Sequence, residues 1–249
     1  MRGMMKRYIK SLADLLFPRE CAVCGRHLLY NEEHLCIYCL NDLPLTYSWD
    51  MKINIFSEKV NALLGQRLDE WEPFTYATAL FYYSYDNQYH ELTKEVKYRA
   101  NLSLGAYIGR LLGERLKESE FFRDVDLVVP VPLHWTRRLK RGYNQSESLV
   151  KGISQVTGWR KDYRILVRSR RTKSQTMLSI GEKMANVSGA FAVDMRHLRR
   201  LKFKPHHILI IDDVLTTGAT MINCQRALRQ VFGPEVRISI ATAAGVQRN

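Results

Sequence analysis

The chain has 249 residues, of which 46% are hydrophobic and 25% are charged, the balance of an ordinary globular protein. Its length allows one sizeable core plus a small accessory module, and no stretch reaches the roughly 18 apolar residues that a membrane span needs. Lysine and arginine number 38 against 25 aspartate and glutamate, so the net charge of +13 favours anionic partners such as phosphate ligands or nucleic acid.

Residues 1–17 begin the chain with a basic, partly apolar segment. Lys10 and Asp14 interrupt its apolar part, so the segment does not match a secretory signal peptide. The spacing of its leucines and isoleucine predicts a basic amphipathic helix instead. We therefore expect a cytoplasmic protein.

Four of the five cysteines form two C-x-x-C pairs, Cys21 with Cys24 and Cys36 with Cys39. Each pair can supply two thiolates from one tight turn, which suits a tetrahedral zinc ion. Two disulfides are the alternative, but a reducing cytosol would disfavour them. A site closed by four sulfur ligands has no open position for substrate, so we expect a zinc ribbon with a structural or partner-binding role.

Other histidines and cysteines receive a plainer interpretation. His27 and His34 lie inside the ribbon loop, but four cysteines already complete the zinc site, so we interpret both as bystanders. Cys224 has the helical spacing of a core residue. His206 and His207 open an apolar run and are expected at the edge of a strand.

The sequence divides into three parts. Residues 1–43 hold the N-terminal helix and the zinc ribbon, and residues 44–75 are weakly helical and are expected to act as a connector. Residues 76–249 alternate between strand and helix patterns, which predicts an α/β domain with a mostly parallel sheet flanked by helices. The expected strands are 76–85, 125–132, 163–168, 189–193, 206–211 and 236–244, and the expected helices are 88–118 with a break near Asn101, 146–156 capped by Ser146, and 218–232.

Residues 206–221, HHILIIDDVLTTGATM, carry the strongest chemical pattern. Ligands of open α/β sheets bind at the carboxyl ends of strands, so Asp212 and Asp213 are expected to be the first residues out of the sheet. From Thr216 to Thr220 the chain should turn into a helix whose free N–H groups cradle a phosphate dianion. Carboxylates accept hydrogen bonds from ribose hydroxyls, so the segment predicts a site for a ribose 5-phosphate. A solvated turn or a helix cap is the plainer alternative for the two acids.

The thirteen residues 208–220, ILIIDDVLTTGAT, resemble the 5-phosphoribosyl-1-pyrophosphate (PRPP) signature of type I phosphoribosyltransferases. Together with the zinc ribbon and with segments 129–145 and 170–191, the signature follows the order seen in the ComF family, the ComFC/GntX-like proteins of DNA uptake. The resemblance covers about residues 18–245 and implies a type I phosphoribosyltransferase-like sheet with a small N-terminal zinc ribbon. Lys183 departs from the family pattern, which more often has arginine there, so the bidentate fork is lost.

The resemblance implies roles for the residues of the signature. In type I phosphoribosyltransferases two acids hold the ribose, and Asp212 and Asp213 match them here as candidate catalytic residues. Mg²⁺ usually binds the pyrophosphate and the ribose hydroxyls and keeps several waters. The residues that match the loop around the 5′-phosphate of PRPP are Thr216, Thr217, Gly218, Ala219 and Thr220.

The resemblance also implies a pyrophosphate loop within 129–145 and a mobile loop within 168–179. Arg138 and Arg141 can screen the charge that grows on the leaving group, and Arg141 is the third candidate catalytic residue. A solvated face or a DNA contact is the alternative for this basic run. The other candidates, polar or permissive residues of the two loops, are Arg137, Lys140, Gly142, Asn144, Gln145, Lys173, Ser174 and Gln175.

Two functional hypotheses remain. The first is a Mg²⁺-dependent transferase that displaces pyrophosphate from PRPP with a nitrogen nucleophile, and no residue identifies the acceptor. The second is a non-catalytic competence protein that holds single-stranded DNA and uses PRPP as a ligand or regulator. Tyrosines interleaved with basic residues suit base stacking and phosphate neutralisation, although the same tyrosines, and Tyr143, fit ordinary packing equally well. The residues concerned are Tyr82, Tyr83, Tyr85, Tyr89, Lys94, Lys97 and Arg99.

Overall fold

The structure, a computed structural model, describes residues 18–65, 75–84, 86–133, 138–139, 141–168 and 190–246. Several sequence predictions fall outside these residues. They are the N-terminal helix of residues 1–17 and the roles suggested for Tyr85, Arg137, Lys140, Lys173, Ser174, Gln175 and Lys183.

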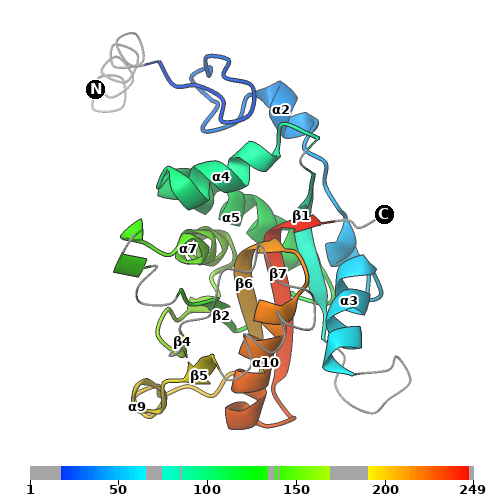
Figure 1. The fold of residues 1–249 in the computed structure, drawn as a ribbon, viewed down its shortest axis with the longest axis vertical. Coiled ribbons are helices and arrows are strands. Elements are labelled where there is room, and N and C mark those ends of the chain that lie inside the picture. The colour runs from blue at the N-terminus through cyan, green and yellow to red at the C-terminus, as the bar shows by residue number, and fades with distance from the viewer. Residues whose placement is uncertain are drawn as a thin grey trace.

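A five-stranded parallel sheet forms the centre of the fold, in the order β1-β7-β6-β2-β3 (Figure 1). The prediction of an α/β fold with a parallel sheet is therefore confirmed. In β6, Ile208 and Ile210 belong to the core cluster on one face, and Leu209 and Ile211 to the cluster on the other. A continuous apolar run is what a strand covered on both faces requires. The strands of this sheet are β1 (Ala77–Tyr83), β2 (Leu127–Pro130), β3 (Arg160–Lys161), β6 (His207–Leu215) and β7 (Arg237–Val246).

Helices cover both faces of the sheet (Figure 1). One face packs against α4, α5 and α7, and the other against α3 and α10. The helical pattern over 88–118 forms two helices, and Asn101 caps the second by accepting a hydrogen bond from Leu104 N at 3.0 Å. The described helices are α2 (Ile37–Asn41), a 3-10 turn η1 (Ser48–Asp50), α3 (Ile55–Leu64), α4 (His90–Tyr98), α5 (Leu102–Glu118), α7 (Gln145–Thr157), α9 (Met195–Leu198) and α10 (Ala219–Phe232). No helix in the described part of the chain is long and apolar enough to cross a membrane.

The cap predicted for α7 is wrong by two residues. Asn144, and not Ser146, is the residue that precedes the helix, and its side chain accepts a hydrogen bond from Ser146 N at 3.3 Å. The Ser146 side chain is therefore inside the first turn of α7, where it can donate to another element.

The edge position predicted for His207 is also wrong. Because β6 lies between β7 and β2, its first residue is fully buried in the sheet. The ring nitrogens of His207 lie 2.9 Å from an Asp124 carboxylate oxygen and 2.7 Å from the Ser239 hydroxyl. Burial lowers the pKa of His207 to about 4. His206 does face solvent, beside Asp126.

Two of the predicted strands form a separate pair. They are β4 (Leu166–Arg168) and β5 (Phe191–Val193), which run antiparallel, with Leu166 opposite Val193. Their apolar side chains join the core cluster on the α10 side of the sheet. The alternation of strands and helices predicted both strands, but it did not predict that they leave the central sheet.

Residues 44–64 pack directly on the sheet. Leu45 bridges to Phe81 of β1, and the Thr46 hydroxyl donates to the Ala79 carbonyl. Phe56 and Val60 of α3 are fully buried in the cluster that includes α10. This part of the predicted connector thus contributes to the core.

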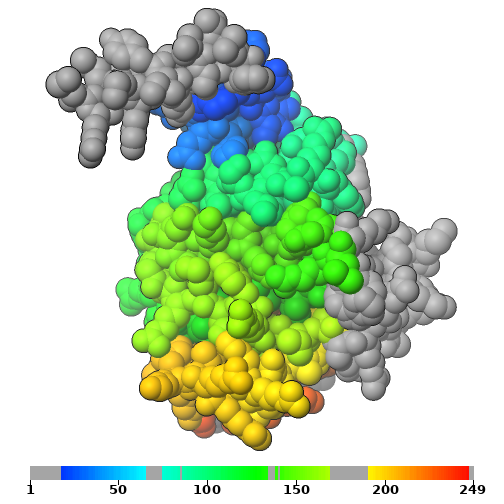
Figure 2. Space-filling model, turned by 90° about the vertical axis from the view of Figure 1, so that its left-hand side faces the viewer, coloured from blue at the N-terminus to red at the C-terminus, as the bar shows by residue number. Residues whose placement is uncertain are grey.

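The ribbon residues rest on α4 and α5, as the blue and teal atoms of Figure 2 show. The Tyr89 hydroxyl, at the start of α4, donates to the Cys39 carbonyl at 3.1 Å. The His34 ring lies 5.6 Å from the Tyr107 ring of α5. Cysteines of the ribbon and apolar residues of both helices therefore share one core cluster.

Glycines let α5 and α7 pack with their backbones in contact. A Cβ on Gly109 would lie 2.2 Å from the Leu149 carbonyl oxygen, and one on Gly152 would lie 2.0 Å from the Ala106 carbonyl oxygen. Neither helix can accept a side chain at these positions without moving. The apolar face predicted for α5 fills the rest of the interface: Leu104, Ile108, Leu112 and Leu116 are buried, and Leu111 is half-buried.

Gly109→Ala is expected to lower the free energy of unfolding by about 1–3 kcal/mol, although alanine favours helices, because the added methyl group overlaps the α7 backbone. Urea unfolding followed by circular dichroism would measure the change. Arg115→Ala, on the exposed side of the same helix, is the control and should stay within about 0.5 kcal/mol of the wild type. Equal stability of Gly109→Ala and the wild type would contradict the close packing.

Candidate functional site

The candidate site lies where the neighbouring strands β2 and β6 end at one edge of the sheet. The predicted ribose-binding acids are part of β6 itself, because Asp212 pairs with Thr242 of β7 and the strand continues to Leu215. The prediction that Asp212 and Asp213 are the first residues out of the sheet is therefore wrong. Pairing with β7 extends the strand past the two acids and holds their backbone rigid.

Asp212 is held by two donors. The Ser146 hydroxyl of α7 and the backbone N–H of Asp213 both donate to its Oδ1, each at 2.9 Å. Burial and the neighbouring Asp213 carboxylate raise the pKa of Asp212 to about 7, against these hydrogen bonds and the charge of Lys97, which lower it. This carboxyl group thus changes its charge near neutral pH.

Asp213 is paired with a lysine that the motifs did not include. The Lys97 ammonium, on the last turn of α4, lies 3.2 Å from Asp213 Oδ2, and Asp213 is only 7% exposed. The Asp213 charge is the main reason that the pKa of Lys97 is raised. The Val214 N–H donates to Asp213 Oδ1 at 3.0 Å. The sequence pattern indicated Lys97 only as part of a possible DNA-binding surface, and not as a partner of Asp213.

The predicted phosphate loop joins β6 to α10. Gly218 has a φ of 83°, a left-handed conformation that favours glycine, and directly precedes α10. Gly218 has no side chain that could cap α10. The first backbone N–H groups of this helix can therefore be offered to an anion. Lys59 of α3 donates to the Thr216 and Val246 carbonyl oxygens, each at 3.2 Å, and ties the loop to the end of β7. Thr216 is exposed, Thr217 and Thr220 are half-buried, and Ala219 is buried.

The described part of the predicted pyrophosphate loop leads into α7. Arg138 lies 3.1 Å from Glu147, and Arg141 donates to Gln145 at 3.4 Å with its guanidinium 5.4 Å from the Tyr98 ring centre. Both arginines are thus engaged with neighbouring side chains of the same edge.

Backbone geometry fixes the end of this loop. Gly142 has a φ of 78°, and the Asn144 amide donates to the Val131 carbonyl after β2 at 3.0 Å. Tyr143, considered as a base-stacking residue, instead uses its hydroxyl to donate to Lys97 O at 2.9 Å and to accept from Ala100 N at 3.1 Å. The loop after β2 is therefore tied to the end of α4.

The four predicted zinc ligands come together in the ribbon. The Sγ atoms of Cys21, Cys24, Cys36 and Cys39 lie within 4.8 Å of one another, and all four thiols are free. Cys24 Sγ and Cys36 Sγ are 3.8 Å apart, and sulfurs bound to one tetrahedral zinc ion are also separated by about 3.8 Å. Neither histidine of the loop belongs to the cluster. The donor set can hold a metal ion such as zinc.

A buried carboxylate that the sequence did not single out organises the ribbon. Glu32 accepts hydrogen bonds from Leu29 N and Ile37 N, both at 2.7 Å, and pairs with Arg26 at 3.1 Å. These N–H donors lower the pKa of Glu32, so it remains ionised. Ile37 follows Cys36 directly, so the carboxylate fixes the turn that carries the second cysteine pair.

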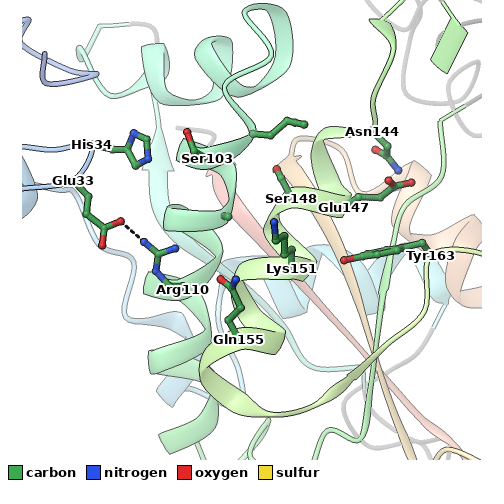
Figure 3. Close-up of a pocket in the computed structure, with 12 residues that line it drawn as sticks. Glu33, His34, Ser103, Arg110, Asn144, Glu147, Ser148, Lys151, Gln155 and Tyr163 are labelled. Atoms are coloured by element: carbon green, nitrogen blue, oxygen red, sulfur yellow. Dashed lines mark hydrogen bonds and ion pairs between the residues drawn. The ribbon is translucent and has the colours of Figure 1, made fainter. Parts of the chain in front are cut away.

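A groove of about 470 Å³ runs between α5 and α7 beside the ribbon loop (Figure 3). Ser148 and Lys151 of α7 point into it, and the Glu33–Arg110 ion pair joins the ribbon to α5 at its far side. Asn144 is the one residue of the predicted site that also lines the groove. The lining mixes carboxylates, cations and neutral groups and does not favour one ligand charge.

The tyrosine-rich segment considered for DNA binding is largely occupied by internal contacts. Tyr89 is 6% exposed, and Tyr82 and Tyr83 pack against the two core clusters. Lys94 pairs with Glu91 at 2.8 Å, and Arg99 pairs with Glu95. The packing interpretation of these described tyrosines is the one that the structure supports.

No family model matches the chain, but curated relatives cover most of it. Competence protein F of Haemophilus influenzae is 25% identical over 225 residues, which are 89% of this chain and 83% of that protein. DNA utilization protein YhgH of Escherichia coli K12 is 26% identical over 211 residues, with coverage of 84% and 83%. Competence protein ComFC of Streptococcus pneumoniae is 24% identical over 155 residues, with coverage of 62% and 63%.

The chain is a homologue of these proteins. Its resemblance to ComF-type competence proteins is thereby confirmed. Two solved structures also show similarity. A glutamine PRPP amidotransferase from B. subtilis complexed with ADP and GMP has a TM-score of 0.37 and 18% identity. An allosteric regulatory enzyme of purine biosynthesis has a TM-score of 0.35 and 19% identity. Each match covers 59% of this chain and 30% of the other chain.

Removal of a metal ion from the cysteine cluster is expected to loosen α4 as well as the ribbon, because Tyr89 and its helix pack on the cluster. Hydrogen exchange of the α4 amides should accelerate by about 10-fold or more after chelation, while the amides of β6 and β7 keep their protection. Cys36→Ser should reproduce the effect, and Cys224→Ala, which changes a buried residue of α10 far from the cluster in sequence, should not. Unchanged exchange in α4 would show that the ribbon does not support it.

Proposed function

We propose that this chain is a ComF-like PRPP-binding protein of DNA uptake or use, which transfers phosphoribose from PRPP to an acceptor and releases pyrophosphate. Relatives named for competence and DNA utilization support the process. The convergence of the two acids with an uncapped helix start at one sheet edge supports the ligand. This convergence is the observation that carries the proposal.

Each part of the edge has a role in this proposal. Asp212 and Asp213 accept hydrogen bonds from the 2′- and 3′-hydroxyls of the ribose. The loop from Thr216 to Thr220, with the N–H groups that begin α10, holds the 5′-phosphate. The two acids lie on β6, whereas the phosphate subsite lies in the loop that follows this strand. The negative charges of the protein and of the phosphate are therefore kept apart.

The transfer step breaks the bond between C1 of the ribose and the pyrophosphate oxygen, and the electron pair leaves with the pyrophosphate. A nitrogen of the acceptor forms the new bond to C1. Arg141 and Arg138 stabilise the charge on the leaving group, and Asn144 and Gln145 follow them at the start of α7. Mg²⁺, bound by the pyrophosphate and the ribose hydroxyls, would supply further charge neutralisation. The roles of Lys173 and Gln175 remain predictions.

The ribbon contributes structure in this proposal. Zinc fits the four-sulfur donor set, and a closed site of this kind supplies folding energy without exposing an open coordination position. The ribbon therefore has no part in the transfer step itself.

Calorimetric titration of Mg²⁺ and PRPP into the wild-type protein should give saturable binding, and Asp212→Asn/Asp213→Asn should weaken it by about 100-fold or more, since two charged acceptors are lost. Asp50→Asn/Asp86→Asn removes the same charge from exposed positions and should bind like the wild type. Equal binding by the site variant and the control would rule out the proposed ribose site. A pyrophosphate assay with a panel of bases and amines then tests turnover.

A second candidate function is the handling of single-stranded DNA, favoured by the surface of the ribbon. Tyr38 is 66% exposed and Tyr30 is 51% exposed, and the Arg26 guanidinium lies 4.8 Å from the Tyr38 ring centre. Exposed aromatic rings beside a cation can stack bases and neutralise phosphates. The DNA surface is thus proposed on the ribbon and not on the tyrosines of β1 and α4.

Binding of a fluorescent oligo-dT should weaken by about 10-fold or more between 50 and 200 mM salt, because phosphate contacts release counterions. Tyr38→Ala should weaken binding at constant salt by removal of a stacking platform. Tyr47→Ala, which removes another exposed tyrosine outside the ribbon, is the matched control. Affinity that does not respond to salt or to Tyr38→Ala would exclude this surface.

A further inference from the structure

We propose that Lys97 is a positioning residue of the phosphoribosyl site, whose ammonium contacts and orients the Asp213 carboxylate, and that Tyr143 fixes the helix end from which Lys97 extends. The role of Lys97 and Tyr143 rests on the proposed function, since both residues orient the carboxylates that accept hydrogen bonds from the ribose hydroxyls. The contacts of Lys97 and Tyr143 themselves are observed in the structure.

The position of Lys97 is set by the packing of α4. This helix has nine residues, and its apolar side, with Leu92 and Val96, is buried in the cluster that includes the ribbon cysteines. Tyr89 anchors its start through the Cys39 carbonyl. Lys97 lies in the last turn, where its side chain, 32% exposed, reaches the sheet edge and the Asp213 carboxylate.

Tyr143 fixes the end of α4. Its hydroxyl donates to the Lys97 carbonyl and accepts from the Ala100 N–H, so one atom joins both sides of the turn between α4 and α5. Ala100 has a φ of 57°, a left-handed conformation that a non-glycine residue adopts only when its surroundings hold it. The loop after β2, the end of α4 and the acid pair are thus one connected unit.

The negative charges of Asp212 and Asp213 explain why a cation at the end of α4 matters. Burial and the Asp213 charge raise the pKa of Asp212, and the Lys97 charge acts in the opposite direction. The other groups around the pair are the Ser146 hydroxyl of α7, Tyr98 of α4 and Cys224 of α10. Burial and, to a smaller extent, the Asp212 charge raise the pKa of Cys224, and the charge of Arg168 of β4 lowers it. None of these replaces the ammonium that contacts Asp213.

Loss of Lys97 should make PRPP affinity depend on pH in a defined direction. Loss of the Lys97 charge moves the protonation of Asp212 to higher pH, so fewer molecules hold an ionised Asp212 near neutral pH. Ribose hydroxyls donate best to ionised acceptors. A variant without the ammonium should therefore bind PRPP weakly at neutral pH and recover part of the affinity in alkaline solution.

Calorimetry with Mg²⁺ and PRPP from pH 6.5 to 9 tests this consequence. Lys97→Met should lose affinity by about 10-fold or more at pH 7 and by less at pH 9, and Lys97→Arg should retain most of the wild-type affinity. Lys94→Met, which removes a lysine of the same helix that pairs with surface Glu91, is the control. Lys97→Met with wild-type affinity and pH profile would overturn the inference and leave the proposed function intact.

A measurement without ligand separates this inference from the proposed function. The raised pKa of Asp212 favours the protonated carboxyl in the folded protein, so its stabilising contribution is present at acidic pH and is lost as the pH rises through about 7. Without Lys97 the folded protein lacks the positive charge that stabilises the two carboxylates when both are ionised. The difference in Tm between the wild type and Lys97→Met should therefore grow by about 3 °C or more from pH 5.5 to pH 8. A constant deficit would overturn the inference even if the wild type binds no PRPP.

Two further variants complete the experiment. Tyr143→Phe removes both hydrogen bonds but keeps Lys97 and the ring, so it should weaken PRPP binding by about 3-fold and shift the pH profile in the same direction as Lys97→Met. If Lys97→Met does not fold, Lys97→Gln, which keeps a donor without the charge, takes its place. A pH profile of Tyr143→Phe identical to the wild type would refute the role of the tyrosine.

Discussion

The placement of two adjacent carboxylates at a half-buried sheet edge is the constraint on which the rest of the structure depends. Burial and the neighbouring Asp213 charge both raise the pKa of Asp212, so a negative charge on Asp212 is harder to keep. The molecule compensates with donors from three elements: Ser146 from α7, Lys97 from α4, and the backbone of β6. The positions of both helices are therefore tied to the charge of the site, and neither can shift without changing it.

The ribbon contributes to this site through α4. A helix of nine residues is marginal by itself, so its order comes from packing. The ribbon supplies much of that packing, because its cysteines and Leu35 share a cluster with Leu92 and Val96. The Glu33–Arg110 ion pair joins the ribbon to α5 as well. The cysteine cluster is thus connected to the acid pair through α4, which packs on the ribbon at its start and contacts Asp213 at its end.

Local patterns predicted most of the fold, and tertiary contacts account for what they missed. The apolar run of β6, the break at Asn101 and the cysteine spacing are visible in short windows of sequence. The strand and the helix break are confirmed, and the four cysteines come together as a cluster that can hold a metal ion. The strand end was misplaced because aspartate is rare in strands, whereas pairing with β7 carries β6 to Leu215. Lys97 was missed because one charge on an amphipathic helix has no local pattern that shows its partner on a distant strand.

The two halves of the candidate site differ in how far they are prepared. The acids and the start of α10 belong to a strand and a helix, so backbone hydrogen bonds hold their geometry. Arg138 and Arg141 instead contact Glu147, Gln145 and the Tyr98 ring through their side chains. A partly exposed ion pair of this kind is worth at most about 1 kcal/mol, so the arginines can exchange these contacts for others at little cost. Under the proposed function, the acids and the start of α10 would bind the phosphoribosyl group, and the two arginines would have to change partners to stabilise the leaving group. The proposed binding therefore requires less rearrangement of this site than the proposed transfer does.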